Sequence, residues 1–468
     1  MARDVHTDFL KLTGFEDWEI GEFMPQWRLA SERLKLTDED VRNAVDEWLP
    51  SNFETGLLSV RKILNCFVRE TVDLTKAVDY KKNGVKIVYG ILPAMSVFYY
   101  ALKLAAPEKV YVGFPDLFLA VVMQGFFHKL APLLEDAEQG GITYGCRHCA
   151  LNKTRFAARR MDIIPDPDIS WIWGLVCDEG PKTDEFIKCL QFPNWNTYVL
   201  RIPRDQPLYT REDEVDERVR YLAAHMKDGF EYVQKQIGVS VPAQKLKDVV
   251  TFRQSYFQKL GQFRKLMAVD PQPYGGAEAY LLSYPLQVPL NTGVERMEQA
   301  LELAIKEVGQ RVERKEGILP AGSPKLMFQI TPYCQPWIIR MFKENGVLLS
   351  AGGATKKGMS PLRFDDPYLQ SAEIWLRGAT IVNIGYQAEQ IAEQLLTYNF
   401  DGMLFGFFDF DRWLGSDDRL LASIVEEKTG LPSFYIEGDF WEDRDYSQEG
   451  LRTRVESICE ILKMRKIG

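Results

Sequence analysis

Two cysteines separated by two residues are the first candidates for chemistry in this chain. Cys146 and Cys149 lie in the run GCRHCA at 145–150, directly before a segment with helical spacing. A thiol at the start of a helix lies at the positive end of the helix dipole, which favours the thiolate that binds metals or reacts. The spacing fits a dithiol redox couple, half of a zinc site or part of an iron–sulfur site. Ala150, in place of a histidine, argues against haem attachment.

A third candidate, Cys177, ends an apolar strand-like segment and is followed by a turn and a helix. Strand ends meet at one edge of a parallel sheet, so thiols far apart in sequence can lie close together. The alternative for Cys177 is a small buried hydrophobic residue. Cys334 also follows a strand and is a further candidate for a functional thiol. The remaining cysteines lie in helical apolar patterns and are expected in the core: Cys66, Cys189 and Cys459.

Other ligand and phosphate motifs are scarce. The chain has four histidines, of which only His148 is near a cysteine pair, so a histidine-rich metal site is not expected. No Gly-x-x-x-x-Gly-Lys-Ser/Thr loop occurs. The glycine-rich run 351–358 follows a strand but lacks the glycine spacing of a dinucleotide-binding motif. We interpret it as a loop for which phosphate contact is the alternative. Aromatic residues near the strand ends suit either a dry cleft or ordinary core packing: Trp171, Trp173, Phe407 and Phe408.

The elements that position these residues alternate between strands and helices. Strand-like runs in the first half are 85–93, 109–115, 142–145, 168–176 and 197–203. A helical stretch from about residue 210 follows, in which apolar residues at 294–312 share one face and Gly317 is the expected stop. The alternation then resumes at 325–332, with further strands near 347, 402–405 and 432–439 and a last helix from Gln448.

This pattern predicts an α/β protein with two doubly wound parallel-sheet lobes and helical N-terminal and middle regions. The expected divisions are a helical region at 1–80, a first α/β lobe with the cysteines at 81–210, a helical region at 211–320 and a second α/β lobe at 321–468. The carboxyl ends of both sheets should face a common cleft, where open α/β sheets bind ligands.

Composition excludes several classes of protein. The 468 residues carry a formal charge of −9, which argues against nucleic acid or an anionic membrane as partner. The longest apolar stretch, 117–123, is shorter than the roughly 20 residues that span a bilayer. The N-terminus lacks the pattern of a secretory signal. We therefore expect a cytoplasmic protein, in which seven cysteines indicate thiols, redox chemistry or metal ligands rather than disulfides.

From about residue 142 to the C-terminus, the order of segments resembles the 2-hydroxyacyl-CoA dehydratase and benzoyl-CoA reductase family. The resemblance is carried by FDGMLF at 400–405, GLPSFYIEGD at 430–439 and QEGLRTRVES at 448–457, with support from the strand end at Cys177. It implies two flavodoxin-like lobes that hold an oxygen-sensitive [4Fe-4S] cluster, with one iron open. It also implies an acyl-CoA thioester substrate, a second subunit, identical or paralogous, and a separate ATP-hydrolysing iron–sulfur activator.

Carried over by position, the resemblance implies Cys149 or Cys146 as the first cluster ligand and Cys177 as the second. The family's third cysteine should fall within 406–413, where this chain has none and Asp411, with Asp409 as the alternative, takes the place. Thiolates are the usual ligands of iron–sulfur clusters, so this departure leaves Asp411, both Cys146 and Cys149, or Cys334 as alternatives.

Three functional hypotheses remain open. The first is an iron–sulfur subunit of an acyl-CoA dehydratase or aryl-CoA reductase, in which one low-potential electron converts the thioester into a ketyl radical. The second is a non-catalytic or electron-relaying partner subunit without a standard cluster. The third is a zinc or dithiol redox protein that uses Cys146, Cys149 and Cys177.

Overall fold

The computed structural model describes the chain in segments. These are residues 4–91, 96–143, 148–174, 179–201, 212–286, 288–329, 335–352, 361–377, 384–407, 412–439, 441–444 and 446–467.

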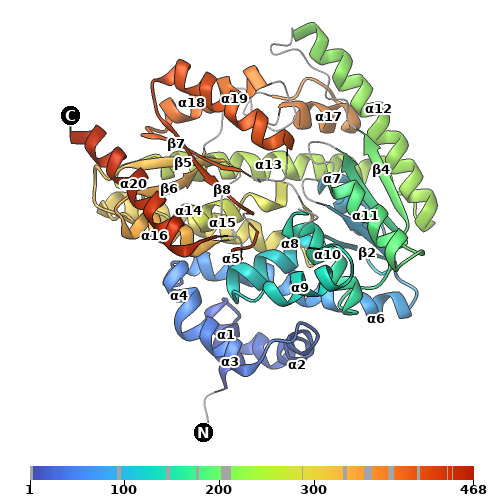
Figure 1. The fold of residues 1–468 in the computed structure, drawn as a ribbon. Helices are drawn as coiled ribbons and strands as arrows, with labels where there is room; N and C mark the ends of the chain where they lie inside the picture. Colours follow the sequence, from blue (N-terminus) through green and yellow to red (C-terminus); the bar gives the residue numbers. More distant parts are fainter. Residues whose placement is uncertain are drawn as a thin grey trace.

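Two sheets of parallel strands form the centres of two lobes (Figure 1). The first contains β1 (Lys86–Gly90), β2 (Val110–Gly113), β3 (Ile169–Gly174) and β4 (Thr197–Arg201), in the order β2-β1-β3-β4. The second contains β5 (Lys325–Gln329), β6 (Leu348–Ala351), β7 (Gly402–Phe407) and β8 (Ser433–Glu437), in the order β6-β5-β7-β8. Every pairing between these strands is parallel, and the same doubly wound order occurs twice. The predicted fold class, α/β with two flavodoxin-like lobes, is confirmed.

Helices cover both sheets, because parallel strands that are apolar on both faces must be buried on both. The helices of the first lobe are α7 (Ser96–Ala105), α8 (Pro115–Ala120), the π-helix η2 (Val121–Phe126), α9 (Ala131–Gln139), α10 (Ala150–Arg160) and α11 (Glu179–Leu190). Those of the second lobe are α16 (Pro336–Glu344), α17 (Pro367–Arg377), α18 (Ile384–Thr397), α19 (Arg412–Thr429) and α20 (Gln448–Ile467).

The N-terminal segment and the middle of the chain are helical. The N-terminal helices are α1 (Val5–Leu12), α2 (Asp17–Arg33), α3 (Asp38–Asn43), the π-helix η1 (Ala44–Trp48), α4 (Leu49–Asn52), α5 (Leu58–Thr75) and α6 (Ala77–Lys82). The middle helices are α12 (Glu212–Ile237), α13 (Ala243–Met267), α14 (Gly276–Leu281), the 3-10 helix η4 (Tyr284–Leu286) and α15 (Glu295–Arg314). The division of the chain into domains stays a prediction.

Helix α13 connects the two lobes. It packs against α7 of the first lobe, against α15, and against α17 of the second lobe. In Figure 1, it crosses the molecule between the second sheet and α7. Its carboxyl-terminal residues Phe263, Arg264 and Met267 lie beside residues of β5 and β6. One face of this helix therefore extends from the first lobe to the second sheet.

Two local expectations are corrected. Ile142 and Thr143 lie in no strand, because the chain turns at Gly141 (φ 117°) after α9 and buries Ile142 through a backbone hydrogen bond to Ala137. Helix α15 ends before Gly317. Lys315 itself takes the left-handed conformation (φ 54°), and the N–H of Glu316 donates to the carbonyl of Arg311, which closes the helix as a glycine would.

Candidate functional site

The start of α10 lies where the two lobes meet. Cys149 is the residue before the helix, with extended backbone (φ −64°, ψ 151°) and an exposure of 9%. The backbone N–H of Ala150 donates to Oδ2 of Asp439 at 2.6 Å. Asp439 follows β8 of the second lobe, and it is 1% exposed. The helix start beside Cys149 is therefore bound to the carboxyl edge of the second sheet.

A second carboxylate binds the same helix start from the first lobe. The N–H of Cys149 donates to Oε2 of Glu179 at 3.1 Å, and Glu179 is the first residue of α11. The first N–H groups of a helix have no partner within the helix and carry its positive dipole end, so buried carboxylates are stabilised there. Glu179 and Asp439 thus bring the ends of β3 and β8 to one place.

Buried Arg155 fixes α10 against its neighbours. Its Nε lies 3.0 Å from Oδ1 of Asp184 on α11, and its Nη1 lies 3.1 Å from Oδ2 of Asp116 on α8. Its Nη2 donates to the carbonyl of Gly180 at 3.3 Å. All three charged side chains are fully buried, and burial raises the pKa of Asp116 to about 6 although Arg155 opposes the shift. The distance between the starts of α10 and α11 is therefore set by a rigid ionic network.

Further polar contacts join the lobes around this position. Arg444 lies 2.9 Å from Glu138 of α9, and Glu138 also pairs with Lys153 of α10 at 3.0 Å. Burial opposes ionisation of Glu138, but hydrogen bonds from Arg444 and Lys153 outweigh it and lower the pKa of this carboxyl. Nε2 of Gln124 in η2 donates to Oε1 of Gln335, the residue before α16, at 2.9 Å. The contacts of Arg444 with Glu138 and of Gln124 with Gln335 therefore cross the interface between the lobes.

Of the predicted ligands, Cys149 lies in the described part of the chain. Cys146, Cys177 and Asp411, like Cys334 and most of the glycine-rich run at 351–358, lie outside the described residues. Within the described residues, no group of three or more histidine, cysteine, aspartate or glutamate side chains is arranged to hold a metal ion. The ligand set of Cys149, Cys177, Cys146 and Asp411 therefore stays a prediction.

The other described cysteines divide between core and surface. Cys66 on α5 and Cys459 on α20 are buried, as expected, and burial raises the pKa of each thiol to about 12. Cys189 is exposed, which corrects the expectation that it lies in the core. The buried face of α11 contains Ile187, and a residue two positions further lies about 200° around the helix.

Of the aromatic residues near the strand ends, one has a described side chain. Trp171 on β3 is fully buried, with its ring 5.2 Å from that of Tyr99 and 6.0 Å from that of Phe230. It belongs to the core of the first lobe. Phe408 and the side chains of Trp173 and Phe407 lie outside the described residues.

Sequence reasoning missed the residues that hold the site together. Glu179 and Asp439 stand in stretches already noted, directly after strands, and an acidic residue at a strand end was the available signal. Arg155 and Asp184 carry no such signal, because an Arg and an Asp on separate helices are ordinary surface residues until the packing is known.

Known proteins are similar to the part of the chain that contains this site. The family model described as "2-hydroxyglutaryl-CoA dehydratase, D-component" matches residues 119–462. The chain is also similar to one of the subunits of the benzoyl-CoA reductase of Thauera aromatica, with 24% identity over 165 residues. That match covers 34% of this chain and 37% of the relative, so the chain spans little more than a third of this relative's length. Across the described residues, the helices are too short or too polar to cross a membrane.

Proposed function

The chain belongs to the 2-hydroxyglutaryl-CoA dehydratase D-component family, and from that premise we propose that it is an iron–sulfur subunit of an acyl-CoA dehydratase or aryl-CoA reductase. The observation that carries the proposal is the position of Cys149, at a helix start to which both lobes contribute a buried carboxylate. Ligands of open α/β sheets bind at this edge, outside the carboxyl ends of the strands.

The proposed ligands of a [4Fe-4S] cluster are Cys149 and Cys177, with Cys146 or Asp411 as the third. Cys177 precedes Glu179 by two residues, a tether of at most about 7 Å, and Glu179 accepts the N–H of Cys149. In the sequence, Asp411 comes four residues after the last residue of β7. Strand β7 pairs with β8, and Asp439 comes two residues after β8. A buried cysteine at this junction fits the donor chemistry that iron–sulfur clusters use.

A [4Fe-4S] cluster held by these residues would supply low-potential electron chemistry, which would make removal of an unactivated proton or reduction of an aromatic ring feasible. This chain's own contribution is to keep the site dry and rigid. Cys149, Glu179 and Asp439 are each less than 10% exposed, and Arg155 fixes two of the helices that present them. We propose an acyl-CoA thioester as substrate, a second identical or paralogous subunit, and an ATP-hydrolysing iron–sulfur activator as electron source.

One sequence observation favours a second candidate function. Asp411 stands where the resemblance implies a cysteine, and a carboxylate is a harder ligand than the thiolate that iron–sulfur clusters prefer. A subunit that relays electrons, or that supports a sister chain with the complete cysteine set, fits this substitution.

Metal analysis of anaerobically purified protein tests these candidates. About four irons per chain with broad absorbance at roughly 400 nm support the proposal, because thiolate-to-iron charge transfer produces that band. Protein without metal supports the second candidate in its supporting role, because a chain without a redox centre relays no electrons. A colourless protein that contains zinc contradicts both and indicates a structural zinc site instead.

Cysteine variants test the ligand assignment. We expect Cys149→Ser and Cys177→Ser to lose most of the iron, whereas the exposed Cys189→Ser and the buried Cys459→Ser retain it. Equal iron in all four variants contradicts the assignment. Asp411→Ala decides the third ligand, because unchanged iron content and spectrum in this variant exclude the carboxylate.

A further inference from the structure

Helix α13 carries two arginines on one face. Arg253 and Arg264 are eleven residues apart in the helix. This spacing corresponds to three full turns plus about 20°, so both residues lie on one face, about 16 Å apart along the helix axis. Both are partly buried. Because α13 packs against both lobes, these residues lie at two separate places in the interior of the molecule.

Arg253 lies at the carboxyl edge of the first sheet. Its Nη2 is 3.5 Å from the carbonyl oxygen of Leu286. The same carbonyl accepts a hydrogen bond from Ser96, the first residue of α7, which is the helix that follows β1. The Nε of Arg253 is buried and has no hydrogen-bond partner within the described residues. Burial lowers the pKa of this guanidinium to about 10, so it is still a cation at neutral pH.

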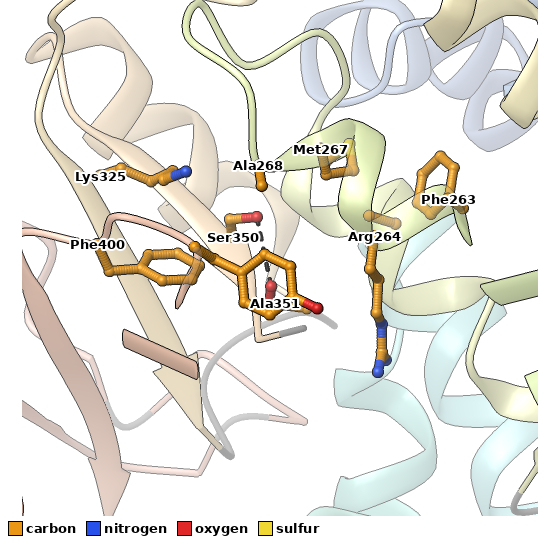
Figure 2. A pocket seen from close by; sticks show the side chains of 10 residues that line it. Phe263, Arg264, Met267, Ala268, Lys325, Ser350, Ala351 and Phe400 are labelled. Atoms are coloured by element: carbon orange, nitrogen blue, oxygen red, sulfur yellow. Dashed lines mark hydrogen bonds between the residues drawn. The ribbon is translucent and has the colours of Figure 1, made fainter. Parts of the chain in front are cut away.

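Arg264 lies beside the second sheet. It lines a small cavity with Ser350 and Ala351, the last two residues of β6. Figure 2 shows its guanidinium projecting away from Lys325 and Phe400, which line the far side of the cavity. Burial lowers the pKa of Arg264, and the groups that oppose this shift are tyrosines. In the described part of the chain it makes no ion pair and no hydrogen bond.

Three other arginines of this protein, by contrast, have carboxylate partners. Arg155 pairs with two aspartates, Arg311 with Glu54 at 2.8 Å, and Arg444 with Glu138 and Glu442. Removing a guanidinium from water without an anion costs free energy, and such residues are retained where a ligand supplies the anion. The planar fork of arginine matches the two oxygens of a phosphate or a carboxylate.

We propose that Arg253 and Arg264 are substrate-binding residues that hold two oxyanion groups of the thioester, one beside each sheet. The inference rests on the proposed function, because a CoA thioester supplies such groups. They come from the phosphates of the CoA portion or from a carboxylate on the acyl portion. With the arginines about 16 Å apart along α13, a ligand that contacts both lies along this helix and extends from one lobe to the other.

Ligand-binding measurements on the full chain, in the assembly in which it purifies, test the proposal. The probes are CoA, pantetheine, inorganic pyrophosphate, and two thioesters of similar acyl length with and without a terminal carboxylate. We expect Arg253→Met and Arg264→Met each to weaken binding of at least one anionic probe by about 10- to 100-fold, the range for a hydrogen bond to a charged group. Lys265→Met removes one charge from an exposed position of the same helix and should change binding less than twofold.

The probes separate the sources of the oxyanion. A loss with CoA and pyrophosphate but not with pantetheine assigns that arginine to phosphate. A loss confined to the carboxylated thioester assigns it to the acyl portion. Wild-type affinity for every probe in both arginine variants overturns the inference and leaves the proposed function standing. Wild-type protein that binds no CoA compound contradicts the proposed function, and pyrophosphate then tests the arginines alone.

Thermal unfolding separates binding from folding. Since neither guanidinium has a carboxylate partner among the described residues, both methionine variants should unfold at or above the wild-type temperature. Arg264→Lys should retain part of the affinity that Arg264→Met loses, because lysine keeps the positive charge but lacks the planar fork of the guanidinium. A lowered unfolding temperature together with lost affinity assigns these residues a structural role and overturns the proposal.

Discussion

Arg155 is fully buried and Arg264 is partly buried, and their surroundings differ. Arg155 touches two buried carboxylates, a side-chain amide and a backbone carbonyl, whereas Arg264 lines a cavity without an anionic partner in the described residues. A buried ion pair that loses one member leaves an uncompensated charge, while a lone buried charge already carries that cost. The comparison indicates that Arg155 serves the fold and Arg264 serves a ligand.

The largest expected effect follows from removing Arg155, which pairs with two buried aspartates. Arg155→Met leaves Asp116 and Asp184 buried without a cation, and we expect it to lower the free energy of unfolding by about 3–5 kcal/mol. Urea unfolding at neutral pH measures this difference. Arg160→Met is the matched control on α10, since Arg160 pairs with Asp136 near the surface and should lose less than about 1 kcal/mol. Equal losses in the two variants would remove the distinction between a buried and a superficial pair.

A second prediction concerns Lys325 at the start of β5, a further cation that makes no ion pair with any described residue. Burial lowers the pKa of its ammonium group from 10.5 to about 8, although Asp401 and Asp270 oppose the shift. Between these pH values, the unfolded chain binds more protons than the folded protein, so stability rises with pH. We expect this contribution to approach about 3 kcal/mol by pH 10.5, and Lys325→Met should abolish it.

Chemical unfolding of wild type and Lys325→Met between pH 7 and about 9.5 checks this sign. The difference between the two proteins isolates Lys325 from the buried tyrosines, because these titrate in both. If the wild type gains no stability relative to the variant over this range, the ammonium group is not desolvated as described.

The smallest expected effect is at the contact between lobes. Asp439→Asn keeps an oxygen for the N–H of Ala150 or for that of Trp441, but it loses the charge and one acceptor. We expect a loss of about 1–2 kcal/mol, the range for a side chain that caps a helix. The change should also increase hydrogen exchange at the start of α10. Unaltered exchange there would show that Glu179 alone holds the helix start.

The sequence patterns predicted the fold well because each strand and helix is defined by residues close together in the chain. Apolar runs such as 168–176 and 402–405 gave strands at β3 and β7, and the repeated alternation gave the parallel sheets. The two local errors arose where Ile142 and Thr143 form no strand, and where Lys315 takes the left-handed conformation in place of an expected glycine.

The site was harder to predict than the fold. Its contacts join residues 289 positions apart, as in the bond from Ala150 to Asp439, and no local pattern encodes such a pairing. Cys149 was recognisable because its chemistry is rare. Arg264 was not, because an unpaired arginine is distinguished from an ordinary one by its surroundings.

The hydrogen bonds between Ala150 and Asp439 and between Gln124 and Gln335 limit how this protein admits a ligand. Both are buried, so swinging the lobes apart as rigid bodies would break them at a combined cost of about 2–4 kcal/mol. A hinged-open form would also break the contact between Arg444 and Glu138, so the docked arrangement of the lobes is favoured.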